Sequence, residues 1–168
     1  MTRRTYIALF AALCMAPLPA CRRAELSGPP TLRLGHDECA ECGMLLSEDR
    51  CAGAMLVDTG SGRAHLVFDD LGCLLDYRDT EGHLAAIEAF VKDYGDRTWL
   101  PAADAWFVAG GPDAPQTPMG SGIVAFEAKE AADAQRSRSG GEVMDYPHLV
   151  TARLGWHQAR QPAPPGTP

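Results

Sequence analysis

One short segment, Cys39-Ala40-Glu41-Cys42-Gly43-Met44, contains most of the residues that could do chemistry. A Cys-x-x-Cys pair is compatible with half of a zinc site, a redox dithiol or a clamp for a soft metal. Cys51 and Cys73 do not repeat that spacing, and no His-x₃₋₅-His pair follows, so zinc is poorly supported. A thioredoxin-like dithiol should open a helix, whereas this pair follows a polar segment and precedes Gly43-Met44 without a clear helical stretch. The redox dithiol is therefore the second choice.

Met44 favours the soft-metal interpretation. A thiolate and a thioether are both soft donors, and together they select copper(I) over zinc, magnesium or calcium. Gly43 lets the backbone turn tightly enough to direct both sulfur atoms at one ion. The alternative is that Met44 is a core residue that fills a gap beside Leu45 and Leu46.

Met119 lies between Pro118 and Gly120, near the end of a loop rich in glycine and proline. Polar loops rarely place a methionine there for packing reasons, so Met119 is a candidate third sulfur ligand. The alternative is a methionine that fills a hydrophobic depression at the base of its own loop.

The other candidates are less specific. His36 and His148 each offer a nitrogen ligand without a distinctive spacing, and Asp69 or Asp70 is expected to cap a helix. Cys73 lies on a short apolar helical face, where a buried and inert thiol is expected. Cys51 is expected either to be buried in the same way or to pair with Cys39.

The pattern of apolar residues predicts two similar units. The first has strands at 54–58 and 63–68, a helix from Leu71, and a returning strand within 84–94, for which a helix is the alternative. The second has strands at 105–109 and 123–126, a helix at 127–138 and a strand at 142–146. Gly140-Gly141 is expected to end the second helix in a left-handed C-cap. This order predicts an α+β fold made of two tandem ββαβ units with antiparallel strands, about 36–97 and 98–150.

The start of the chain predicts export, and its end predicts a disordered tail. Arg3 and Arg4 precede an apolar stretch too short to span a bilayer, so residues 1–20 are typical of a signal peptide. Leu18-Pro19-Ala20-Cys21 resembles a bacterial lipobox, which makes Cys21 the expected lipidated residue. We expect a lipid-anchored tether over 21–35 and a Pro-rich disordered tail over 151–168.

The charge excludes one large class of partners. Removing residues 1–20 takes away two arginines and no acid, so 13 Lys and Arg remain against 22 Asp and Glu, a net charge of −9. Nucleic-acid binding requires a basic face, so it is not expected. The acidic balance suits an exported protein or a surface that docks onto a basic partner.

Several segments in this order resemble the NosL family of lipoproteins, copper chaperones for the assembly of nitrous oxide reductase. They are ECAECGM, HLVFDDLGCLLDY, VKDYGDRTWLPAADAWFVAG, PMGSGIVAF and GGEVMDY, and they cover about His36 to Tyr146. The resemblance implies two ββαβ-type units, related to the metal-handling domain of organomercurial lyases. It also implies copper(I) bound by Cys42 and Met44 and a matching loop methionine, Met119. The first cysteine of the Cys-x-x-Cys pair is not present in all relatives. The resemblance therefore leaves Cys39 as either an additional ligand or a redox partner.

We therefore expect a non-enzymatic copper(I) carrier, anchored by lipid on the periplasmic side of the bacterial envelope, that passes its ion to an acceptor protein in metal-centre assembly. The alternative is a periplasmic thiol–disulfide oxidoreductase that uses Cys39 and Cys42. A lyase would need a catalytic acid beside paired cysteines, and the sequence does not place one.

Overall fold

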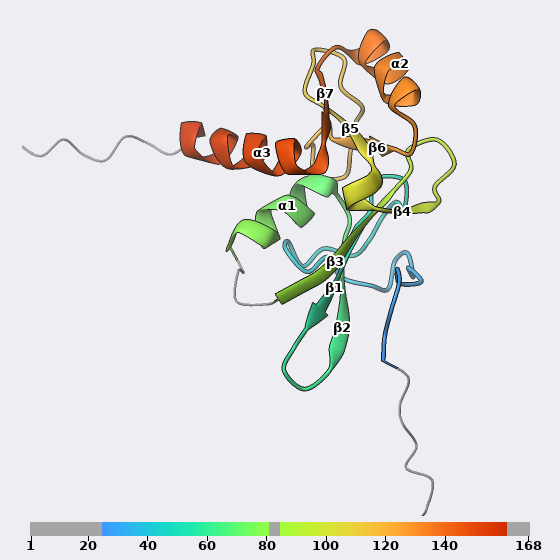
Figure 1. Ribbon diagram of the computed structural model, residues 1–168, viewed down its shortest axis with the longest axis vertical. Coiled ribbons are helices and arrows are strands. Elements are labelled where there is room, and N and C mark those ends of the chain that lie inside the picture. Colours follow the sequence, from blue (N-terminus) through green and yellow to red (C-terminus); the bar gives the residue numbers. More distant parts are fainter. Residues whose placement is uncertain (1–24, 81–84, 161–168) are drawn as a thin grey trace, which may run out of the picture.

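The structure, a computed structural model, describes residues 25–80 and 85–160. The predicted signal peptide, Cys21 and the start of the predicted tether lie outside the described residues. Within these two ranges the chain forms two antiparallel sheets and three α-helices (Figure 1). Among the described residues, no helix combines the length and apolar character needed to cross a bilayer.

The first unit is a four-stranded sheet in the order β2-β1-β3-β4. Its strands are β1 (Gly53–Asp58), β2 (Arg63–Phe68), β3 (Ala85–Lys92) and β4 (Trp99–Pro101). Strand β1 is apolar and almost entirely buried because it pairs with β2 on one side and β3 on the other. Helix α1 (Leu71–Thr80) connects β2 to β3.

The second unit is a three-stranded sheet in the order β6-β5-β7. It consists of β5 (Trp106–Ala109), β6 (Val124–Phe126) and β7 (Glu142–Asp145), with helix α2 (Lys129–Ser139) between β6 and β7. The first strand is again central, so both units have the predicted ββαβ order and the α+β class is confirmed.

The two units are fused rather than separate. A parallel bridge joins Asp93 to Ala125, and the Glu127 N–H donates a 2.8 Å hydrogen bond to Asp93 Oδ2. One hydrophobic core extends from Phe68 and Leu71 in the first unit to Phe107 and Ile123 in the second. Residues near the junction are therefore held by packing from both sides.

The expected C-cap of α2 is present. Gly140 has a φ of 71° and its N–H donates a 2.8 Å hydrogen bond to the Arg136 carbonyl. Gly141 has a φ of 86°, and a Cβ there would lie 2.5 Å from the carbonyl oxygen of Ala109. Only glycine permits this close crossing between the end of α2 and the loop after β5.

The segment before Tyr94 is strand β3, the preferred of the two predicted alternatives, and it pairs with both β1 and β4. Three other elements differ from the prediction. Strand β4 and the short 3₁₀ helix Ala102–Asp104 (η1) were not predicted. The expectation of a disordered tail from residue 151 is wrong over its first part. Helix α3 (Tyr146–Arg160) continues from β7, and Leu149 is buried in the core.

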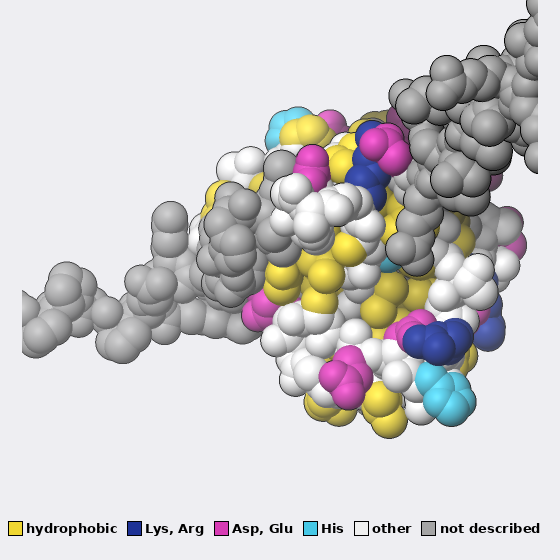
Figure 2. Space-filling model, turned by 90° about the horizontal axis from the view of Figure 1, so that it is seen from below, with side chains coloured by type: hydrophobic (Ala, Val, Ile, Leu, Met, Phe, Trp, Pro, Cys, Tyr) yellow, Lys and Arg dark blue, Asp and Glu magenta, His cyan; other side chains and the backbone are white. Residues whose placement is uncertain are grey.

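The surface mixes apolar and charged groups. On the face shown in Figure 2, patches of hydrophobic side chains are separated by acidic side chains, and the basic side chains lie beside acidic ones. The acidic side chains on this face are thus spread out and not gathered in one block.

Candidate metal centre

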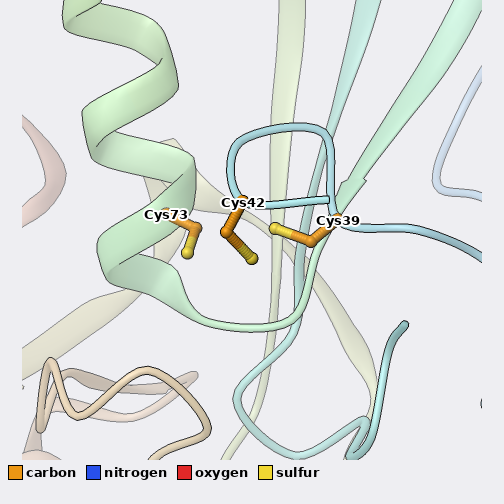
Figure 3. Close-up of side chains that lie close together, drawn as sticks. All are labelled: Cys39, Cys42 and Cys73. Atoms are coloured by element: carbon orange, nitrogen blue, oxygen red, sulfur yellow. The ribbon is translucent and has the colours of Figure 1, made fainter. Parts of the chain in front are cut away.

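Three thiols from two elements converge at the start of α1. Cys39 and Cys42 come from the loop before β1, and Cys73 comes from the first turn of α1. Their sulfur atoms all lie within 4.8 Å of one another, and the side chains point toward a common centre in Figure 3. All three are free cysteines. Thiolates at this spacing are suited to a soft metal ion.

The loop that carries Cys39 and Cys42 is closed on itself. The Cys39 N–H donates to the Met44 carbonyl and the Gly43 N–H donates to the Cys39 carbonyl, both at 2.8 Å. A bridge between Glu38 and Leu45 closes the base of the loop. Gly43 has a φ of 72°, a conformation that favours glycine and completes the tight turn predicted from the sequence.

Asp69 fixes this loop to the body of the protein. Its buried carboxylate accepts hydrogen bonds from the Ser47 N–H at 2.8 Å and the Ser47 hydroxyl at 2.9 Å. The Ala40 N–H donates to the Val67 carbonyl at 2.9 Å, which ties the other side of the loop to β2. The two sulfurs are thus held against the end of β2 and the start of α1.

Asp70 caps α1, as expected for Asp69 or Asp70, and also holds a second loop. Its Oδ1 accepts the Gly72 N–H at 2.6 Å, the interaction of an N-cap residue. Its Oδ2 accepts the Thr117 hydroxyl at 2.6 Å and the Met119 N–H at 2.9 Å. The loop between β5 and β6 is therefore attached to the same helix start that carries Cys73.

Cys42 and Met119 line one cavity of about 240 Å³. Cys73 lines it as well, and the other lining residues are Glu41, Asp70, Gly72, Asp76, Ser121 and Arg153. The side chain of Met119 is 44% exposed, so it stands at the mouth of the cavity. The structure brings this predicted loop methionine to the same cavity as the predicted cysteine.

Met44 occupies a different position. It is 54% exposed and does not line the cavity, although it follows Cys42 by only two residues. Its N–H donates to the Cys42 sulfur, an interaction that favours the thiolate. The alternative interpretation of Met44 as a core residue is wrong, because more than half of its surface is open to solvent.

The surrounding hydrogen bonds favour the thiolate form of one member of the cluster, Cys39. Hydrogen bonding from the Cys73 thiol lowers the pKa of Cys39 to about 5, and the N–H groups of Cys42, Asp69 and Glu41 also stabilise its thiolate. The same interaction raises the pKa of Cys73, because its thiol is the donor. Burial raises the pKa of Cys42, and the negative charge of Cys39 adds to that effect.

Arg153 supplies a positive charge from α3. Its guanidinium donates two hydrogen bonds of 2.7 Å to the Asp76 carboxylate on α1. Arg153 is the one basic residue among the described residues that line the cavity. The pair attaches the C-terminal helix to the helix that carries Cys73.

The remaining sequence candidates lie apart from the three thiols. Cys51 is buried in a separate core group with Val108 and Phe126, and burial raises its pKa to about 12. His148 pairs with Asp145 at 2.6 Å at the start of α3. Among the described residues, neither His36 nor His148 belongs to a potential metal-binding group with the cysteines.

Cys73 is the residue that sequence reasoning underestimated. It is buried, as predicted, but it lies beside Cys39 and Cys42 instead of among apolar side chains alone. One sequence feature does indicate a functional thiol, since Cys73 lies three residues after the helix cap Asp70, in the first turn of α1. The positive end of a helix dipole favours a thiolate there.

Comparison with known proteins agrees with this architecture. The NosL family model matches residues 33–153, so the chain belongs to the NosL family. A solved structure, that of the copper chaperone NosL from Shewanella denitrificans, matches with a TM-score of 0.57 and 23% sequence identity. The match covers 74% of this chain and 99% of that one, and at this identity it shows a shared fold. A comparison with curated proteins finds no match.

Proposed function

We propose that this protein is an exported lipoprotein that carries copper(I) and delivers it for assembly of a metal centre, that of nitrous oxide reductase. The observation that carries the proposal is the position of Cys42. Its sulfur lies within 4.8 Å of the Cys39 sulfur, and its side chain lines the same cavity as Met119. The family membership and the structural match to a copper chaperone support the same conclusion.

The proposed ligands are Cys42, Met44, Met119 and Cys39. Cys39 and Cys42 supply thiolates and the two methionines supply thioethers, a donor set that selects copper(I). Met44 and Met119 are both exposed, so an acceptor protein can reach the ion from their side. Binding by such a mixed set is strong enough to hold copper(I) while leaving a path for ligand exchange.

The route of export belongs to the proposal as well. Residues 1–20 act as a signal peptide and Cys21 receives the lipid, which places the domain on the periplasmic side of the membrane. The lipid keeps the carrier close to the membrane-associated acceptor. Mass spectrometry of the protein from membranes tests this step, and an unmodified Cys21 would contradict it.

The thiol–disulfide alternative gains less support from the geometry. A reactive cysteine combines a lowered pKa with exposure. Here the thiol with the lowered pKa, Cys39, is only 2% exposed, while burial raises the pKa of the more accessible Cys42. The arrangement stabilises a thiolate inside the protein, which suits a metal ligand better than an attacking nucleophile.

The direct test is an anaerobic titration of the full, reduced chain with copper(I) against a chromophoric chelator. We expect one ion per chain to be retained at chelator concentrations that strip weak sites. Complete transfer of copper to the chelator, from a folded protein with reduced thiols, would overturn the proposed function.

A further inference from the structure

The sulfur atoms of the site fall into a buried set and an exposed set that share one residue. Cys39 and Cys73 are 2% and 6% exposed, whereas Met44 and Met119 are among the exposed large hydrophobic residues. Cys42 lies between the two sets, because its sulfur is near both buried thiols and its side chain also lines the cavity with Met119. The site therefore offers an ion two adjacent environments.

We infer that Cys73 is a metal ligand, and that Cys39, Cys42 and Cys73 form an inner, three-thiolate position for one soft metal ion. The inner position adjoins the outer one, where Cys42 and Met119 line the same cavity. This inference rests on the proposed function and assigns a retaining role to the buried half of the same site.

The geometry of the three thiols supports an inner position. Sulfur atoms that all lie within 4.8 Å of one another can surround a single ion with small side-chain rotations. Figure 3 shows the three side chains approaching a common centre from the loop and from α1. Since the buried residues Asp69 and Asp70 hold both elements by hydrogen bonds, the three sulfurs are positioned before any ion arrives.

The contrast with Cys51 argues against simple packing. A buried cysteine ordinarily acts as a small apolar residue, and Cys51 does so beside Val108 and Phe126. Cys73 instead meets two other sulfurs at the start of a helix and also lines the cavity. The positive end of α1 favours negative charge at this point, as three thiolates require.

Transfer then proceeds by ligand exchange at copper(I). The bonds from copper to Cys39 and Cys73 break as bonds to Met119 and to a sulfur of the acceptor form, while Cys42 stays bound. The released Cys73 thiolate takes a proton from water, and Cys39 remains a thiolate that accepts a hydrogen bond from the Cys73 thiol. Copper remains copper(I) throughout, so the step requires no oxidant or reductant.

The first test compares the rate of copper(I) release from the full chain to an excess of chelator. Cys73→Ser removes an inner ligand, so we expect release to be roughly tenfold faster or more than in the wild type. Cys51→Ser is the matched control, since it changes a buried thiol outside the cluster. Its release rate should stay within about twofold of the wild-type rate.

A second test needs no variant that might fail to fold. One equivalent of mercury(II) is added to the copper-free wild-type chain, and its ultraviolet charge-transfer spectrum is recorded. Three thiolates give low-energy bands that a linear two-thiolate complex lacks, so we expect those bands. A two-thiolate spectrum, with an unchanged release rate in folded Cys73→Ser, would overturn the inference.

The two proposals fail in different ways. A wild-type chain that loses copper(I) to the chelator but gives the three-thiolate mercury spectrum would refute the copper carrier and keep the inner position. A wild-type chain that retains copper(I), with a two-thiolate mercury spectrum and no effect of Cys73→Ser, would refute the inner position and keep the copper carrier.

Discussion

The backbone N–H of Met119 donates a 2.9 Å hydrogen bond to Asp70, the residue that caps the helix carrying Cys73. Asp70 is completely buried, and the Thr117 hydroxyl donates to the same carboxylate oxygen. A long loop of the second unit is thereby fixed to the first helix of the first unit. The Asp70 carboxylate thus positions Met119, a candidate ligand, and is not proposed as a ligand itself.

Asp70→Asn should loosen this loop and weaken copper binding. An amide nitrogen opposite the Met119 N–H would be a donor facing a donor, and the charge-assisted bonds would be lost. We expect the free energy of unfolding to fall by about 2–3 kcal/mol. Urea denaturation measures this loss, and copper(I) affinity should fall in the same direction as in Met119→Ala.

The matched control for that variant is Asp145→Asn. Asp145 also accepts a backbone N–H near the start of a helix, that of His148 in α3, but its side chain is exposed. It should change the free energy of unfolding much less. Equal losses in the two variants would mean that Asp70 acts as an ordinary cap only.

The proposed copper ligands predict a graded series. Cys42→Ser should abolish tight copper(I) binding, because Cys42 belongs to both sulfur sets. Met119→Ala should weaken binding and leave the fold intact, since its side chain is exposed at the cavity mouth. Competition titrations give the affinities and circular dichroism checks the fold; unchanged affinity in both variants would exclude the proposed site.

The lowered pKa of Cys39 predicts a pH-dependent stability. The thiolate form is stabilised in the folded protein, with a pKa of about 5 against an ordinary value of 9.0. Its contribution is therefore complete above pH 9, declines as the pH falls and is lost below about 5. The difference in melting temperature between the wild type and Cys39→Ser should grow from pH 5 to pH 9. A difference independent of pH would show that Cys39 has an ordinary pKa.

The ion pair between Arg153 and Asp76 predicts a measurable coupling. Its two parallel hydrogen bonds are largely shielded from solvent, so screening is weaker than at the surface. A double-mutant cycle with Arg153→Gln and Asp76→Asn should give a coupling energy of roughly 1–2 kcal/mol. Coupling near zero would mean that α3 is held by its apolar contacts, such as those of Leu149.

The sequence predicted the fold well where local signals agreed. The apolar run of β1, the Asp70 cap and the Gly140 C-cap each combine pattern with turn chemistry, and those elements formed as expected. The errors occurred where tertiary contacts decide. Strand β4, which was not predicted, depends on pairing with β3, and α3 is helical beyond residue 151 in a segment where composition alone predicted disorder.

The candidate site was predictable in part for the same reason. The Cys-Gly-Met turn is local, so Cys42, Met44 and Cys39 could be proposed from spacing alone. The proximity of Cys73 to the other thiols depends on how the helix start packs against the loop. Its place in the first turn of a helix indicates only that a thiolate is favoured there, not which residues lie beside it. The attachment of Met119 depends on a carboxylate 49 residues earlier in the chain.

The unequal exposure of the sulfur donors has a chemical consequence in an oxidising compartment. Met44 and Met119 are open to solvent, and oxidation turns a thioether into a sulfoxide, a polar group with an oxygen donor. Cys39 and Cys73 are shielded, so the same exposure to peroxide reaches them later. Mild oxidation would thus change the exposed methionines before it reaches the buried thiols, so the two parts of the site would fail in a fixed order.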